Sequence, residues 1–148
     1  MLIIGGGIVG CAAAYFLASA GVPVVLCEKG RIAGEQSGRN WGWVRQQGRS
    51  AVELPLMMHS LRLWQGLEQQ LQQDLGFTQG GSLYLAQSAE QLESFRAWLG
   101  TAREFGLDTR ILSPQQLGSV LHGAADRWVG AMHTPSDARA EPNRAAAA

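Results

Sequence analysis

Residues 2–28 read LIIGGGIVGCAAAYFLASAGVPVVLCE, and this stretch determines the fold expected for the start of the chain. An apolar run over 2–4 predicts a β-strand, and the pattern over 8–20 predicts a helix. A second apolar, β-branched run over 23–27 predicts a buried strand, and Glu28 stands at its carboxyl end. A strand, a helix and a strand with an acidic end form the β-α-β pattern that binds dinucleotides.

Three glycines between the first strand and the helix form a G-x-G-x-x-G motif. Gly5 permits the tight turn, Gly7 lets the backbone approach a pyrophosphate, and Gly10 lets the helix pack closely on the sheet. The pyrophosphate is expected on the free N–H groups at the helix start. Glu28 follows Gly10 by 18 residues, the spacing of an acidic group that accepts ribose hydroxyls.

The composition narrows the class of protein. The chain has 148 residues, a formal net charge of zero and 46% hydrophobic residues, which suits a domain with a hydrophobic core. A balanced charge gives no electrostatic reason to expect nucleic acid or an anionic membrane as partner. Cys11 and Cys27 are expected to be buried thiols in a reducing compartment. The three histidines are scattered and no zinc spacing is present, so we predict no metal site.

The apolar run over 8–27 has about the length of a membrane span. Gly10, Gly21 and Pro23 interrupt it, however, and no basic segment precedes it as in a secretory signal. A buried helix followed by a parallel strand therefore explains the run better than a transmembrane segment. We predict a cytoplasmic protein, with a peripheral position at the inner membrane left open.

A glycine-rich stretch with two tryptophans, GRIAGEQSGRNWGWVRQQGR, follows at 30–49. It predicts a long loop with one helical turn near 35–38, and a long loop in a compact protein is usually functional or disordered. Trp41 and Trp43 argue against disorder because they are expected to be buried. Small and polar residues here suit a close approach to a ligand, namely Ser37, Gly38, Asn40 and Gly42.

The remaining chain predicts a different arrangement of elements. An amphipathic helix is expected over 50–75, with Gly76 as its C-cap. Its apolar stripe consists of Met57, Leu61, Trp64, Leu67, Leu71 and Leu75. Further along, we expect strands at 82–86, 109–112 and 128–133, and helices at 88–105, 113–121 and from Pro142 onward. Ser88 and Ser113 are the expected N-caps of the first two of these helices.

These later strands do not repeat the β-α-β rhythm. The predicted class is α/β, with a Rossmann-like unit and a loop at 1–49. The start of an α+β domain follows at 50–134, and 135–148 returns toward the first unit. A single β-α-β unit does not make a complete doubly wound sheet, and the element that opens at Pro142 is expected to continue beyond Ala148. We therefore expect the chain to be part of a longer protein.

Residues 3–30 and the run GEQSGRNWGWVRQQGR resemble the N-terminal part of FAD-dependent oxidoreductases of the D-amino-acid oxidase type. That family includes glycine oxidase, sarcosine oxidase and D-amino-acid dehydrogenase. The run SGRNWGWVRQQG is most similar to the branch that holds hydrogen cyanide synthase and opine oxidase subunits. GAMHTPSDARAEPNRAA at 130–146 resembles the family's return to its FAD domain, although Arg139 stands where glycine is common.

The resemblance implies FAD as cofactor and a role for each matching position. It places the pyrophosphate at the glycine-rich turn, the adenosine at the end of the second strand and the flavin beside the following loop. Arg39 and Arg45 are either phosphate partners or solvated charges. The implied cofactor-binding residues are Gly5, Gly7, Ile8, Val9, Gly10, Glu28, Lys29, Gln36, Ser37, Asn40, Trp41, Gly42 and Trp43.

The resemblance also implies a reaction, the dehydrogenation of a small amine or amino acid. Hydride would pass from the carbon that bears nitrogen to flavin N5, and water would hydrolyse the resulting imine. The catalytic residues are unknown, because the family's substrate-binding residues lie mostly in the second half of its chains, beyond the part matched here. This chain alone is therefore expected to be a weak or inactive flavoprotein. Two alternatives remain, an NAD-binding module and a non-catalytic subunit that docks a partner through the 50–75 helix.

Overall fold

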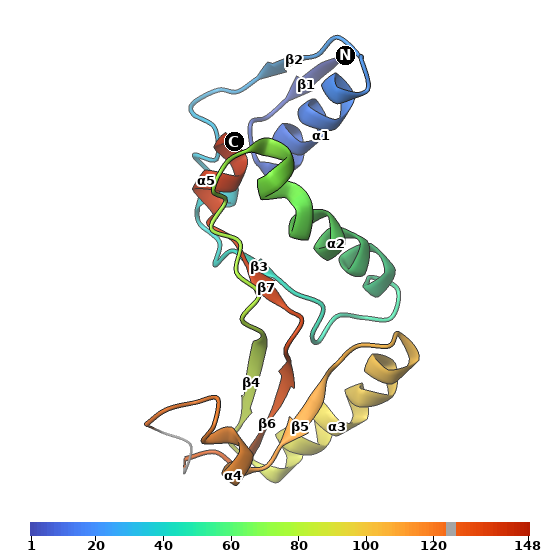
Figure 1. Ribbon diagram of the computed structural model, residues 1–148, viewed down its shortest axis with the longest axis vertical. Helices are drawn as coiled ribbons and strands as arrows, with labels where there is room; N and C mark the ends of the chain where they lie inside the picture. Colours follow the sequence, from blue (N-terminus) through green and yellow to red (C-terminus); the bar gives the residue numbers. More distant parts are fainter. Residues whose placement is uncertain (124–126) are drawn as a thin grey trace. The chain divides into compact units, whose positions relative to one another are not determined.

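The computed structural model describes residues 1–123 and 127–148 and divides the chain into two compact units (Figure 1). Unit 1 contains residues 1–43, 64–78 and 139–148, and unit 2 contains residues 44–63 and 79–138. The chain therefore passes between the units more than once. The predicted division at 1–49, 50–134 and 135–148 stays a prediction.

Unit 1 begins with the expected β-α-β unit. Its elements are β1 (Leu2–Ile4), α1 (Ile8–Ser19) and β2 (Val25–Cys27). The two strands are parallel, with Leu2 opposite Val25 and Ile4 opposite Cys27, and α1 packs against both. Parallel neighbours need a crossover connection, which α1 supplies. Gly21 stops the helix with a φ of +78°.

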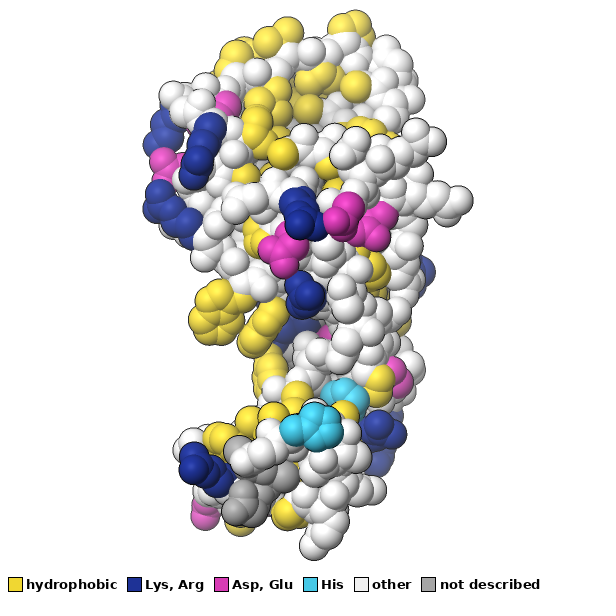
Figure 2. Space-filling model, turned by 60° about the vertical axis from the view of Figure 1, so that its left-hand side comes forward, with side chains coloured by type: hydrophobic (Ala, Val, Ile, Leu, Met, Phe, Trp, Pro, Cys, Tyr) yellow, Lys and Arg dark blue, Asp and Glu magenta, His cyan; other side chains and the backbone are white. Residues whose placement is uncertain are grey.

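The expectations of a buried second strand and a buried helix are wrong, because no residue of β2 or α1 is buried. The apolar strand β1 is also mostly exposed. Leu2, Ile4 and Val25 are 62%, 85% and 61% exposed, and Cys27 is exposed as well. The strands are exposed because little covers them. Among the described residues, the sheet has only two strands, and α1 is the helix that packs against it. Figure 2 shows hydrophobic side chains at the surface at the end of the molecule that carries β1 and β2.

Four short elements follow β2 in unit 1 or at its boundary. The helical turn η1 gives the predicted turn near 35–38, and α5 packs against both α1 and η1. The strands β3 and β7 pair with each other, and the boundary between the units falls inside each of them. These elements are η1 (Gln36–Gly38), β3 (Trp43–Val44), β7 (Ala138–Arg139) and α5 (Pro142–Ala147).

The amphipathic helix α2 (Leu54–Leu71) is shorter than expected. The six stripe positions are buried or half-buried, which confirms the apolar stripe. Gly76 is not the C-cap, because the helix ends at Leu71 and Gln72 takes the left-handed backbone with a φ of +54°. Glu68 accounts for the early end, since its carboxylate accepts the N–H groups of Leu75 and Phe77 and turns the chain back.

Unit 2 is built on an antiparallel sheet with the order β4-β6-β5. The helix α3 packs on all three strands, and Leu112, Leu117 and Ala131 form a core cluster. The Ser88 and Ser113 hydroxyls cap the helices α3 and α4, as their sequences predict. The elements are β4 (Ser82–Ala86), α3 (Ala89–Glu104), β5 (Arg110–Leu112), α4 (Pro114–Leu117) and β6 (Gly130–Thr134).

Among the described residues, every helix is too short or too polar to span a bilayer.

Candidate functional site

The turn from β1 to α1 requires glycine at the predicted positions. Gly5 has a φ of +106°, a conformation that L side chains rarely adopt. A Cβ at Gly10 would lie 2.0 Å from the Gly5 carbonyl oxygen, so the helix could not stay this close to the turn. A Cβ at Gly7 would lie 2.9 Å from the Ser37 hydroxyl oxygen. The glycines therefore permit a close backbone approach at the start of α1.

The start of α1 presents backbone donors. The first N–H groups of a helix have no partner within it, and Gly7 at the N-cap offers no side chain to accept them. The Ile8 N–H donates to the Ser37 hydroxyl oxygen at 2.9 Å. Ser37 thus joins η1 to the first turn of α1, and its own O–H remains a donor. This junction has the donor chemistry that an anionic group needs.

Glu28 lies at the carboxyl end of β2, as the sequence predicts. Its carboxylate accepts the Gly6 N–H at 2.7 Å and the Gly30 N–H at 2.8 Å. These two bonds hold the pKa of Glu28 below its ordinary value, so the group is a carboxylate at neutral pH. Each carboxylate oxygen can accept more than one hydrogen, so Glu28 can still receive hydroxyl donors.

Asn40 folds the 36–43 loop onto itself. Its side-chain Nδ2 donates to the Ser37 carbonyl oxygen at 2.7 Å, and its Oδ1 accepts the Gly42 N–H at 2.7 Å. Gly42 has a φ of +69°, and its carbonyl oxygen accepts the Ala140 N–H at 2.9 Å. The loop is therefore anchored at Ser37 and at Gly42, with Asn40 between the two anchors.

Trp41 and Trp43 form an edge-to-face pair with ring centroids 5.4 Å apart. Trp41 is 81% exposed and Trp43 is 50% exposed, so the expectation that both are buried is wrong. The edge-to-face contact between the rings and the backbone hydrogen bonds of Gly42 hold the pair in place. Two large apolar rings at the surface are available to cover an apolar partner.

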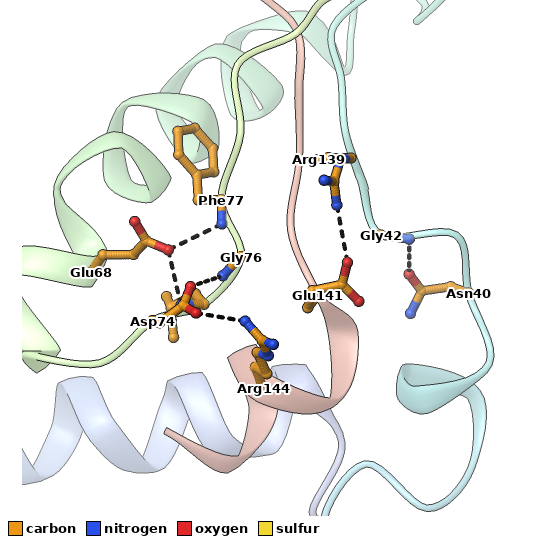
Figure 3. A network of polar contacts seen from close by, with 10 residues as sticks. Asn40, Gly42, Glu68, Asp74, Gly76, Phe77, Arg139, Glu141 and Arg144 are labelled. Carbon is orange, nitrogen blue, oxygen red and sulfur yellow. Dashed lines mark hydrogen bonds and ion pairs between the residues drawn. The ribbon is translucent and has the colours of Figure 1, made fainter.

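The segment that returns to unit 1 holds the loop from its other side (Figure 3). Ala140 bonds Gly42, and the Glu141 N–H donates to the Leu75 carbonyl oxygen at 2.8 Å. Arg144 donates to the Asp74 carboxylate at 2.6 Å, close to where Asp74 accepts the Gly76 N–H. The segment therefore lies between the 36–43 loop and the chain that follows α2.

The predicted site residues separate into two groups. The glycine turn, Ile8, Glu28 and Ser37 are brought together by the bonds described above. Lys29 and Arg39 instead pair with Glu35 at 3.4 and 3.2 Å on the exposed side of the loop. Val9 is 80% exposed at the start of α1, and Gln36 is exposed at the start of η1.

Sequence reasoning missed two contributors to this site. Gly6 is buried and donates to Glu28, and a Cβ there would lie 2.6 Å from Ile32 Cδ1, so that side chain would have to move. The middle glycine of a GGG run carries no separate signal in the motif. Ala140 bonds Gly42 from almost a hundred residues away, and a lone alanine gives no indication of that.

The chain is similar to known proteins over its whole length. The model of the FAD dependent oxidoreductase family matches residues 1–148. A mitochondrial sarcosine dehydrogenase of Mus musculus is 30% identical over 149 aligned positions, which cover 96% of this chain and 16% of that protein. The mitochondrial pyruvate dehydrogenase phosphatase regulatory subunit of the same species is 33% identical, with 93% and 16% covered.

Solved structures resemble the chain in three dimensions as well. The L-amino acid deaminase from Proteus myxofaciens, solved in complex with anthranilate, superimposes with a TM-score of 0.90 and 31% identity. That match covers 98% of this chain and 34% of the deaminase chain. The chain therefore spans about a sixth of the curated relatives named here and about a third of this structure.

Proposed function

This chain belongs to the family of FAD-dependent oxidoreductases, and on that premise we propose that it forms the adenosine- and pyrophosphate-binding part of an enzyme that dehydrogenates an amine or amino acid. The observation that carries the proposal is the junction of Gly7, Ile8 and Ser37 beside the Glu28 carboxylate. A helix start with backbone donors next to an acidic strand end is the arrangement that dinucleotides require.

The residues at this junction fit a pyrophosphate. Gly7 leaves the space that a Cβ would fill, and the N–H groups of the first turn of α1 point out of the helix end. The free O–H of Ser37 is a donor for a phosphate oxygen, while Glu28 accepts from ribose hydroxyls. We assign the pyrophosphate to Gly5, Gly7, Ile8, Val9 and Gly10, the ribose to Glu28 and the adenine side to Lys29.

The 36–43 loop fits the other half of the cofactor. We assign Gln36 and Ser37 to the phosphates and ribityl chain. Trp41, Gly42 and Trp43, together with Asn40, form the flavin side of the loop. The exposed tryptophan rings support this assignment, because an apolar ring system would cover them.

FAD, when bound, supplies the oxidising group that takes the hydride from the carbon bearing nitrogen. The residues of this chain contribute binding and orientation: backbone donors hold the phosphates, and the 36–43 loop orients the ring system. Water is excluded on one side by Trp41 and Trp43. We name no catalytic residue, and the substrate class and the cytoplasmic location stay predictions.

The test measures cofactor binding and reduction separately. The purified protein is titrated with FAD and with NAD, and bound flavin is followed by its absorbance and fluorescence. We expect FAD to bind and NAD not to displace it. Anaerobic addition of sarcosine or an amino acid is then expected to bleach the flavin absorbance of the full-length protein, whereas residues 1–148 alone are expected to be inactive. Displacement of FAD by NAD would favour the NAD-binding alternative instead.

A matched pair of glycine variants tests whether FAD binds at the junction of Gly7, Ile8 and Ser37. Gly7→Ala places a methyl group against Ser37, so FAD affinity should fall about tenfold or more. Gly66→Ala is the control, because a Cβ at Gly66 meets no atom within 4 Å and lies on α2. Equal FAD affinity in the two variants would contradict the proposed pyrophosphate site.

A second candidate function is a non-catalytic subunit. The observation that favours it is the 33% identity to a protein named as a phosphatase regulatory subunit. Such a subunit would bind FAD without being reduced by an amine, and would dock a partner through the exposed leucines of α2, Leu56 and Leu63. Flavin that binds but stays oxidised with every amine tested, together with a co-purifying partner, would support it.

A further inference from the structure

Resting on the FAD site proposed above, we infer that Asn40 is a positioning residue that fixes both anchors of the 36–43 loop and acts on the cofactor through Ser37 and Gly42. The amide of Asn40 is engaged at both polar ends by its own loop. Its Nδ2 donates to the Ser37 carbonyl oxygen at 2.7 Å, and its Oδ1 accepts the Gly42 N–H at 2.7 Å. A third, longer contact of 3.5 Å runs from Nδ2 to the Gln36 carbonyl oxygen.

The first anchor connects Asn40 to the phosphate end of the site. Asn40 holds the Ser37 carbonyl, and the hydroxyl of the same Ser37 accepts the Ile8 N–H at 2.9 Å. Gly7 permits this approach, because a Cβ there would lie 2.9 Å from the Ser37 hydroxyl oxygen. The position of the Ser37 hydroxyl at the start of α1 therefore depends on Asn40.

The second anchor connects Asn40 to the flavin end of the site. Gly42 is buried, has a φ of +69°, and leaves only 2.0 Å between a Cβ and the Ala140 carbonyl oxygen. Its carbonyl accepts the Ala140 N–H, while its own N–H donates to Asn40 (Figure 3). Gly42 lies between the two tryptophans, so Asn40 sets the direction in which their backbone leaves the loop.

The consequence is that one side chain serves both halves of the cofactor through the backbone groups that it holds. A residue that contacts the flavin directly affects only ligands that carry a flavin. A residue that places the Ser37 hydroxyl also affects the binding of ADP, which contains the pyrophosphate but no flavin. Binding of ADP therefore separates the two roles.

The experiment measures the affinity of the purified protein, freed of bound nucleotide, for FAD and for ADP. We expect Asn40→Ala to weaken both by a similar factor, about tenfold, since two backbone hydrogen bonds are lost. Asn40→Asp keeps the acceptor for Gly42 and loses the donor to Ser37, so ADP affinity should fall in this variant as well. Because it retains one anchor, it serves as the test should Asn40→Ala fail to fold.

Trp41→Ala is the matched control from the neighbouring position. Trp41 is 81% exposed and lies on the flavin side, so its removal should weaken FAD while ADP affinity stays unchanged. The same pattern for Asn40→Ala, loss of FAD affinity alone, would overturn the inference. Unchanged affinity for both ligands would overturn it too.

A readout without ligand completes the test. Amide hydrogen exchange in the nucleotide-free protein should become faster at Gly42 and at Ile8 in Asn40→Ala. The Gly42 N–H loses its acceptor, Asn40 Oδ1, and the Ile8 N–H loses the loop that places the Ser37 hydroxyl. Unchanged exchange at both amides would overturn the inference. If the wild-type protein bound neither FAD nor ADP, the proposed function would fail, and the exchange result would still decide the role of Asn40 in the loop.

Discussion

The sheets of the two units bury their strands very differently. In unit 2, every residue of β6 is buried, and Met132 at its centre is 2% exposed. In unit 1, Ile4 at the end of β1 is 85% exposed. The exposed strand β1 is wholly apolar, whereas the buried strand β6 includes His133 and Thr134, so composition does not explain the contrast. Burial of a strand depends on what covers it.

The strands β6 and β1 differ in how many other elements pack against them. The strand β6 has a strand neighbour on both edges, packs against α3 and α4, and contributes Ala131 to the core cluster with Leu112 and Leu117. Among the described residues, β1 has one strand neighbour and one packed helix. Parallel sheets are normally covered on both faces, which explains why their strands read as continuous apolar runs. The sequence of β1 is such a continuous apolar run, but the described residues cover only one of its faces.

The largest expected effect is a core substitution in unit 2 compared with its counterpart in unit 1. Leu112→Ala removes a side chain that is 4% exposed and should lower the free energy of unfolding by about 2–5 kcal/mol. Ile4→Ala removes a side chain that is mostly in water and should change it by about 0.5 kcal/mol or less. Denaturant unfolding of the two variants beside the wild type measures both.

The comparison would change if Ile4→Ala proved as damaging as Leu112→Ala. A loss of about 2 kcal/mol or more at Ile4 would mean that the apolar face of β1 is covered in solution, because an exposed methyl group does not contribute that much. A small loss at Leu112 would instead show that the core of unit 2 relaxes around the cavity.

This contrast marks the limit of what sequence predicts about the fold. The β-α-β unit, α3 and the serine caps at Ser88 and Ser113 follow from local patterns, and the structure confirms them. The exposure of Ile4 and Trp41 depends on which other elements lie nearby, and a local pattern carries no such information. The end of α2 at Leu71 has the same origin, because it depends on the Glu68 side chain accepting N–H groups further along.

Two helical glycines, Gly10 in unit 1 and Gly100 in unit 2, differ in the space that surrounds them. Gly10→Ala places a Cβ 2.0 Å from the Gly5 carbonyl oxygen, so the helix must move off β1. We expect a loss of about 1–3 kcal/mol, the range for overpacking. Gly100→Ala lies within α3 with no atom within 4 Å of the added Cβ. It should stabilise by about 0.5–1 kcal/mol, because alanine favours a helix over glycine.

Thermal or denaturant unfolding of the pair distinguishes packing from propensity. Both sites are helical, so helix propensity alone predicts that both substitutions stabilise the protein. If Gly10→Ala were as stable as Gly100→Ala, the close approach of α1 to the turn would not be a requirement of the fold.

The candidate site shows the same division between local and distant information. The positions of Gly5, Gly7, Gly10 and Glu28 follow from the spacing of one motif. The bond from Ile8 to Ser37 crosses 29 residues, and the bond from Gly42 to Ala140 crosses far more. Hydrogen bonds between such distant segments leave no periodic trace, so the anchoring role of Asn40 becomes visible only in the structure.

The smallest expected effect compares how the two units respond to acid. His133 in unit 2 is buried, and its burial and the Arg110 charge hold its pKa below 6.5, although Asp108 and Asp137 oppose this shift. The unfolded state therefore binds a proton first, and stability falls as the pH drops below about 6.5. Glu28 in unit 1 has its pKa held below 4.5 by the N–H groups of Gly6 and Gly30, so its contribution persists until the pH falls below about 4.5.

Two variants separate these two pH ranges, and amide hydrogen exchange measures the stability of each unit. His133→Gln should remove the loss of stability in unit 2 that begins near pH 6.5 and leave unit 1 unchanged. Glu28→Gln should lower the stability of unit 1 at neutral pH and flatten its fall below about pH 4.5, because glutamine keeps one acceptor and has no charge to lose. If either variant altered the acid response of both units equally, the units would not unfold independently. The contrast between an open and a covered sheet would then describe burial and not stability.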